Sequence, residues 1–274
     1  MGIKFDMSEQ ENKHLLRETK FENFKFFSYI NDWMGLDIIN GKIWEPHIVN
    51  FIKYNFKNTS TFIDIGSNYG WHSVIAAQIC KKVYSFEPQK YIFNVLNKNI
   101  EINDLDNVQT FNLGVGNVNC EMEMNQIDYN VESLNIGDLG IGTGGEKISV
   151  VQMDSLEFDN VDFIKIDVQG FEKFVIMGAE NTILKYFPTM IVEFEDWHLS
   201  KFSYNSIDLF EYLKSLGYEF FLLDYHYPSD HICVHTNKLS EFIIQNEKFI
   251  FNLSDKNNIN QNVSFGVNKK LKYN

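Results

Sequence analysis

The chain has 274 residues, 44% of them hydrophobic, and a formal net charge of −13, a size that suits one large α/β domain with at most a small appendage. The acidic excess argues against nucleic acid as a partner, because a phosphate backbone would be repelled. No stretch approaches the ~20 consecutive apolar residues that cross a bilayer, so we expect no membrane span.

The first predicted unit is residues 1–43, a helical extension ahead of the main domain. The beginning of this extension is polar, whereas the stretch from Phe21 to Asn40 is rich in aromatic residues and should pack as a cap. Apolar residues then recur at helical spacing from Trp44 to Phe56. We expect the resulting helix to lie against the central sheet.

Apolar strands and helices alternate along the middle of the chain, an order typical of a parallel sheet with helices on both faces. The predicted strands cover 61–65, 83–86, 108–112, 163–166 and 190–194, with a closing pair over 218–223 and 232–235. The predicted helices cover 71–80, 89–103, 175–184 and 207–216. We therefore expect a doubly wound, mostly parallel sheet of seven strands.

Two further segments lie outside this alternation. A short strand over 121–124 precedes a long loop with glycines at positions 137, 140, 142, 144 and 145. Loops of this length inside a compact domain are usually lids or binding loops. The main domain is expected to cover 44–250, which leaves an Asn-rich tail over 251–274.

The clearest functional signal is the turn that follows the first predicted strand. The strand runs into the spacing Gly66-x-x-x-Gly70, and the next strand ends in Glu87. A strand, a tight turn and an acid at the tip of the next strand are typical of a nucleoside-binding half-fold. The turn lacks the middle glycine of a dinucleotide fingerprint, and Asp64 offers a carboxylate to a cationic ligand. S-adenosylmethionine (SAM) fits this pattern better than NAD does.

The predicted cofactor site follows from this topology, since ligands of such sheets bind at the carboxyl ends of the strands. The two glycines would let the chain turn beneath the amino-acid part of SAM, although glycines also mark ordinary β-to-α turns. The acid would accept hydrogen bonds from both ribose hydroxyls, and the residues after the third strand would line the adenine. The predicted cofactor residues are Asp64, Gly66, Ser67, Asn68, Gly70, Glu87, Leu113 and Gly114.

The predicted catalytic residues lie at the ends of the fourth and fifth strands and are Asp167, Glu193 and His198. Asp167 could act as general base, orient the cofactor amine, contribute to a metal site or cap the following helix. Glu193 lies deeper in its apolar run than Glu195 does, and His198 is a further candidate base. A divalent ion such as Mg²⁺ stays open as an alternative that we do not favour.

Several segments together resemble the FkbM-type SAM-dependent methyltransferases. They are Phe-Ile-Asp-Ile-Gly-Ser-Asn-Tyr-Gly-Trp-His-Ser (62–73), Phe-Glu-Pro (86–88), Asn107-Val108 leading to Gly114–Asn117, Met153–Leu156, Phe163–Glu172, Gly178-Ala179 and Pro188–Glu193. The resemblance, which runs from about Trp44 to about His235, implies the Rossmann-like fold of class I methyltransferases and methylation of hydroxyls, often on sugars. This chain has Gln169 where that family usually has Glu, so the resemblance implies no catalytic or metal-binding duty for this position.

We therefore expect a SAM-dependent O-methyltransferase that acts on a hydroxyl of a sugar or glycoconjugate. The sequence leaves open an acceptor of another kind, namely a phenol, a carboxylate or a nitrogen, and a catalytically silent member that only binds SAM. Assembly into a homo-oligomer also stays open. Three widely spaced cysteines and a start without an apolar signal region predict a cytoplasmic protein.

Overall fold

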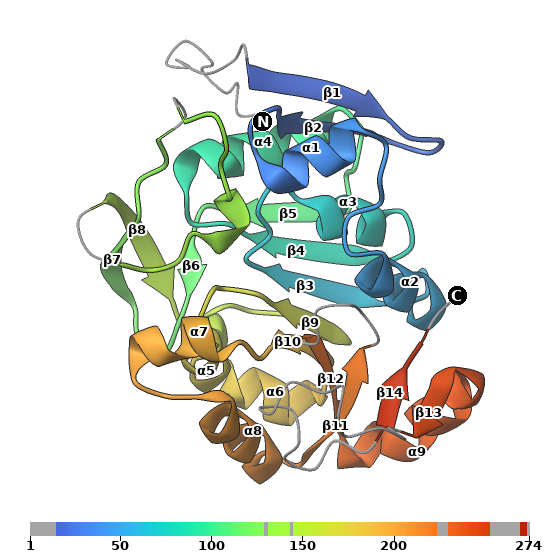
Figure 1. Cartoon of the computed structure of the whole chain (residues 1–274). Helices are drawn as coiled ribbons and strands as arrows, with labels where there is room; N and C mark the ends of the chain where they lie inside the picture. The colour runs from blue at the N-terminus through green and yellow to red at the C-terminus, as the bar shows by residue number, and fades with distance from the viewer. Residues whose placement is uncertain (1–14, 129–130, 143–144, 224–229, 253–268, 273–274) are drawn as a thin grey trace.

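The computed structural model describes residues 15–128, 131–142, 145–223, 230–252 and 269–272 (Figure 1). The N-terminal part of this structure differs from the predicted helical extension. It begins with an antiparallel hairpin of β1 (Leu16–Lys20) and β2 (Lys25–Tyr29), followed by α1 (Trp33–Ile39) and α2 (Pro46–Asn55). β2 carries part of the aromatic stretch and packs against the main domain: Phe26 is fully buried and lies edge-on to Trp71, 5.1 Å away between ring centroids.

The central sheet has nine described strands in the order β13-β14-β11-β12-β10-β9-β3-β4-β5, which runs from lower right to top in Figure 1. The strands are β3 (Thr61–Ile65), β4 (Lys82–Phe86), β5 (Val108–Phe111), β9 (Phe163–Ile166), β10 (Thr189–Glu193), β11 (Tyr218–Leu223), β12 (Asp230–His235), β13 (Ile250–Asn252) and β14 (Lys269–Leu271). The five strands from β5 to β10 are parallel, whereas β12 is antiparallel to both of its neighbours.

Seven of these strands are the predicted ones, and β13 and β14 extend the sheet beyond the prediction. The predicted tail over 251–274 was therefore wrong in part, because Lys269–Leu271 pairs with β11 inside the sheet. Leu271 is fully buried there, and the burial of this apolar side chain offsets the conformational entropy that the polar segment loses when it becomes ordered. Residues 253–268 and 273–274 of that tail lie outside the described residues.

The helices cover both faces of the sheet, and the alternation of β3 shows the division. Phe62 packs in a core with α2, α3 (Trp71–Ala77) and α4 (Lys90–Glu101), whereas Ile63 packs in a second core with helices that follow β9 and β10. The remaining helices and turns are η3 (Ile136–Asp138), η4 (Met153–Ser155), α5 (Glu172–Met177), α6 (Glu180–Tyr186), α7 (Asp196–Leu199), η5 (Ser200–Phe202), α8 (Ser206–Ser215), α9 (Thr236–Asn246) and η6 (Glu247–Phe249). Among the described residues, none of these helices has the length and apolarity to cross a membrane.

The helix predicted over 175–184 is two helices, α5 and α6, with a break at Gly178. The carboxylate of Asp154 accepts the backbone N–H groups of Asn181 and Thr182 at 2.9 and 2.8 Å, which caps the N-terminus of α6. A side chain at Gly178 would also collide with the Gly116 carbonyl. Tertiary contacts from a distant loop therefore divide a segment whose apolar spacing reads as continuous.

A small second sheet carries the loop region between β5 and β9. It consists of β6 (Gly114–Val115), β7 (Cys120–Met124) and β8 (Glu146–Val151), with β8 in the middle. The strand predicted over 121–124 corresponds to β7, and β8 is a strand that the sequence reading missed. The predicted glycine-rich loop lies between them, and its described part includes η3.

Candidate active site

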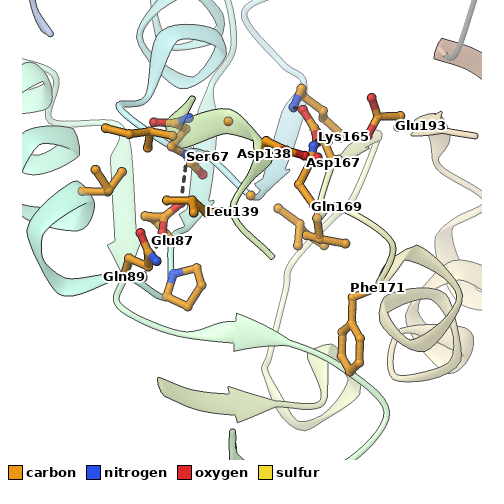
Figure 2. A pocket seen from close by; sticks show the side chains of 18 of the residues that line it. Ser67, Glu87, Gln89, Asp138, Leu139, Lys165, Asp167, Gln169, Phe171 and Glu193 are labelled. Atoms are coloured by element: carbon orange, nitrogen blue, oxygen red, sulfur yellow. Dashed lines mark hydrogen bonds and ion pairs between the residues drawn. The ribbon is translucent and has the colours of Figure 1, made fainter. Parts of the chain in front are cut away.

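A cavity of about 630 Å³ lies at the carboxyl ends of the parallel strands. The sheet order changes direction there, because β3 has β4 on one side and β9 on the other, which is where such folds bind ligands. Figure 2 shows two groups facing this space: Glu87 and Gln89 on one side, and Lys165, Asp167 and Glu193 on the other.

The turn after β3 forms one wall of the cavity with Gly66, Ser67 and Asn68. Backbone N–H groups of Gly66 and Ser67 donate to the Phe86 carbonyl at 3.1 and 3.0 Å, which fixes the turn to the end of β4. Gly66 has φ of 79°, and a side chain there would collide with the Asp167 carbonyl. Glycine is therefore required at this position because the ends of β3 and β9 approach each other closely.

Glu87 lies beside this turn and is 7% exposed. Its Oε2 accepts the backbone N–H of Asn68 at 3.0 Å, and its Oε1 accepts that of Gln89 at 2.9 Å. Burial raises the pKa of the Glu87 carboxyl to about 7, although these two hydrogen bonds lower it. A carboxylate has about four lone-pair sites, so both oxygens can still accept hydrogen bonds from a ligand in the cavity.

The cavity beyond Glu87 is apolar. Leu113 and Gly114, which the sequence predicted to line the adenine, line this end of the cavity together with Met124, Ile141 and Ile148 from the small sheet and the loop. This end can therefore hold a flat, weakly polar group next to the carboxylate.

Two predicted cofactor residues, Asp64 and Gly70, lie behind the wall of the cavity. Asp64 is 1% exposed, and its Oδ2 accepts the Ser73 hydroxyl at 2.5 Å. Burial raises the pKa of Asp64, while Lys165 and Ser73 lower it. A side chain at Gly70 would collide with Leu96, so this glycine permits α3 to pack against α4. Both residues support the turn from below.

On the opposite side, Asp167 and Glu193 are joined by the side chain of Gln169. Asp167 Oδ1 accepts Gln169 Nε2 at 2.8 Å, and the same nitrogen donates to Glu193 Oε2 at 3.3 Å. Gln169 has a left-handed backbone with φ of 56°, a conformation found at functional sites when the surroundings enforce it. An amide at this position therefore separates two acids that would otherwise repel each other.

Lys165 is a site residue that the sequence reading missed. It is 3% exposed on β9, and its Nζ donates to Asp167 Oδ2 at 2.9 Å. Burial alone would lower the pKa of Lys165, but the carboxylates of Asp167 and Asp64 raise it above its ordinary value. The signal was present in the sequence, because a lysine inside the apolar run Phe163–Ile166 needs a buried acidic partner.

A further group joins α2 and α3 to the start of β12, and its members Glu45, His47 and Asp230 were missed in the sequence. His47 Nε2 lies 2.7 Å from Asp230 Oδ2, and His72 Nε2 lies 3.3 Å from Glu45 Oε2. Burial raises the pKa of Glu45 and lowers that of His72, so burial favours the neutral form of both partners. The two partners of each contact are far apart in the chain, and no local pattern of the sequence relates them.

His198 lies on α7 with both ring nitrogens engaged. Its Nδ1 is 3.0 Å from Lys201 Nζ, and its Nε2 is 3.2 Å from Asp138 Oδ1 and 3.4 Å from Glu195 Oε2. Since a lysine ammonium only donates, Nδ1 accepts and Nε2 carries the hydrogen. Burial and Lys201 lower the pKa of His198. The imidazole therefore ties α7 to η3.

The loop with η3 reaches the cavity because the N-terminal extension anchors it. The buried Asp32 accepts the N–H of Ile136 with Oδ1 and that of Gly35 with Oδ2, both at 2.9 Å. The Leu134 N–H donates to the Asn31 carbonyl at 2.6 Å. Within the part of the chain that the structure describes, no group of three or more His, Cys, Asp or Glu side chains has the arrangement of a metal site.

The order β5-β4-β3-β9-β10-β12-β11, with β12 antiparallel, is the Rossmann-like fold of class I methyltransferases. Residues 64–220 match the family model described as "Methyltransferase FkbM domain", and the chain belongs to this family. No curated protein matches the sequence.

Three solved structures illustrate the likeness to known proteins. Methyltransferase FkbM from Methylobacillus flagellatus KT is 18% identical with a TM-score of 0.46, covering 65% of this chain and 44% of its own. An rRNA methylase from Streptococcus thermophilus is 11% identical with a TM-score of 0.41, covering 69% and 91%. TYW2 of M. jannaschii, in complex with AdoMet, is 12% identical with a TM-score of 0.41, covering 80% and 84%. The chain thus spans less than half of the length of the first of these.

Proposed function

We propose that the protein is a SAM-dependent O-methyltransferase whose acceptor is a hydroxyl of a sugar or glycoconjugate. The proposal depends on the two acids that face one cavity from opposite sides. Glu87 is buried and held by backbone N–H groups, whereas Glu193 is held by the side chain of Gln169.

The cavity suits SAM in size and in the chemistry of its lining. Its volume of about 630 Å³ is within the usual range for sites that enclose small molecules. Glu87 would accept hydrogen bonds from the two ribose hydroxyls, and the apolar end of the cavity with Leu113 and Gly114 would hold the adenine. Gly66, Ser67 and Asn68 would hold the amino-acid part. When bound, SAM supplies a methyl group that is already activated on a sulfonium.

Among the three predicted catalytic residues, we assign the role of general base to Glu193. Burial first, and then the negative charge of Asp167, raises the pKa of Glu193 well above its ordinary value. A raised pKa makes a carboxylate a better acceptor for the proton of a hydroxyl. Glu193 therefore accepts the acceptor's proton through a carboxylate oxygen.

Asp167 and His198 take supporting roles in this proposal. Both Asp167 oxygens already accept hydrogen bonds, from Lys165 and Gln169. His198 has no lone pair available while Nδ1 accepts from Lys201. Gln169 is consistent with catalysis, because its amide holds Glu193 in place and removes no base from the site.

Labelled SAM and a panel of neutral sugars, phenols, carboxylic acids and amines test the proposal. We expect calorimetry to detect SAM binding and mass spectrometry to detect a methyl ether on a sugar. Glu193→Gln should lower kcat by about 10²-fold or more with SAM affinity unchanged. Glu211→Gln, an exposed acid on α8, is the matched control. Transfer to a nitrogen or a phenol alone, or SAM binding without any transfer, would refute the proposed acceptor class.

A further inference from the structure

All four tryptophans of the chain line the cavity, although they come from separate segments. Trp71 is 1% exposed and belongs to the core, whereas Trp33 and Trp197 are 58% and 71% exposed. A single exposed apolar side chain on a protein surface is ordinary. Two exposed indoles that line the same cavity are less ordinary, and they suggest a role in binding a ligand there.

The two exposed indoles are carried by opposite parts of the fold. Trp33 begins α1 in the N-terminal extension, and Trp197 lies on α7 after β10 (Figure 1). Trp33 Nε1 donates to the Ser133 hydroxyl at 2.6 Å, so its polar group is used within the protein. The Lys201 ammonium lies 5.9 Å from the centroid of the Trp197 ring. Trp33 therefore offers mainly its apolar ring to a ligand, and Trp197 offers the part of its ring that Lys201 does not face.

The charge of the cavity restricts what such a ligand can be. Its described lining includes a single lysine or arginine, Lys165, whose ammonium is held by Asp167. The same lining has seven carboxyl side chains, at positions 45, 87, 138, 167, 193, 195 and 230. Carboxylates accept hydrogen bonds from hydroxyls, whereas an added anion would be repelled. Burial first, and then the neighbouring carboxylates Asp230 and Asp167, raise the pKa of Glu45 and Glu193, respectively.

Aromatic rings beside hydrogen-bond acceptors match the chemistry of a sugar. One face of a pyranose presents C–H groups that pack on an aromatic ring, and its edge presents hydroxyls. We propose that Trp33 and Trp197 stack on sugar units of a glycan that carries no acidic group, and so extend the acceptor site beyond the cavity. This inference rests on the proposed function and adds the charge and the length of the acceptor.

The test uses the full chain saturated with S-adenosylhomocysteine. The probes are an array of neutral oligosaccharides and the same glycans carrying uronate, sulfate or phosphate groups. We expect binding to neutral glycans only. Trp33→Ala and Trp197→Ala should each weaken that binding roughly tenfold, as for the loss of one aromatic contact with its buried area. Ile244→Ala, which removes a 76% exposed side chain of α9 outside the cavity, is the control.

Methyl-transfer kinetics distinguish a failure of the tryptophan contacts from a failure of the proposed function. With neutral oligosaccharides, both tryptophan variants should show a raised KM and a kcat close to that of wild type, and the rise in KM should be smaller for a free monosaccharide, which makes fewer ring contacts. Equal binding of acidic glycans, no glycan binding, or tryptophan variants that match wild type would overturn this inference alone, provided that wild type methylates a neutral sugar. If SAM does not bind, or no sugar is methylated, the proposed function fails as well.

Discussion

The pKa of Glu87 makes a quantitative prediction about SAM binding. Burial raises this pKa to about 7, so the carboxyl titrates within the pH range in which the protein can be assayed. Ribose hydroxyls donate hydrogen bonds, and they bind the ionised carboxylate more strongly than the neutral acid. SAM affinity should therefore fall as the pH is lowered through 7.

The size of this effect follows from the fraction of Glu87 that is ionised. With a pKa of about 7, the ionised fraction is about 0.9 at pH 8 and about 0.1 at pH 6. If only the ionised form binds well, the affinity should fall by about tenfold between these two pH values. Glu87→Gln should bind SAM at least tenfold more weakly than wild type at pH 8, because a charge-assisted contact is worth ~1.5–3 kcal/mol.

The assay is calorimetry of SAM binding at pH 6, 7 and 8 with wild type, Glu87→Gln and the exposed control Glu101→Gln. The comparison with Glu87→Gln removes the contribution of other titrating groups, including the amino group of SAM itself. Between pH 8 and pH 6, we expect the SAM affinity of wild type and of the control to fall about tenfold more than the SAM affinity of Glu87→Gln does. Equal pH dependence in all three proteins, or full affinity in Glu87→Gln, would refute the ribose role of Glu87.

Three further predictions concern neighbouring residues. Burial raises the pKa of Glu172 from 4.5 to about 7, and a raised acid pKa gives stability that is present at low pH and lost as the pH rises through 7. The free energy of unfolding of wild type relative to Glu172→Gln should therefore fall by about 2.5 kcal/mol between pH 5 and pH 8, and urea unfolding that gives the same difference at both pH values would contradict this. Gln169→Glu replaces the donor between Asp167 and Glu193 with a third carboxylate, so the acid limb of the kcat–pH profile should move to higher pH; an unmoved limb would show that Gln169 does not act on the base. Turnover should stay within twofold after dialysis against EDTA, because hydrogen-bond donors already occupy the Asp167 oxygens, and a loss that Mg²⁺ restores would reverse this assignment.

The central sheet was predictable because its signals are local and strong. The runs 61–65 and 163–166 are strands with these same bounds in the structure, since short, mostly apolar segments of this length suit a strand buried on both faces. The topology then placed Gly66, Glu87 and Asp167 at one edge, and the structure brings all three to the cavity.

The remainder depends on contacts between distant parts of the chain. The hairpin β1–β2 forms because Phe26 packs against Trp71, which no local pattern of its sequence reveals. The contact between His47 Nε2 and Asp230 Oδ2 joins residues from opposite ends of the domain's sequence. Lys165 was the exception, because its position inside an apolar strand was visible and its meaning was missed.

Asp32 has a consequence for how proteins of this design could diverge. Its carboxylate joins the N-terminal extension to the turn at Ile136, and both of these segments line the cavity from outside the central sheet. Glu87, in contrast, is held by the sheet's own turns. If the proposed function holds, exchange of the extension together with its loop should change which acceptor is methylated and leave the contacts of Glu87 in place.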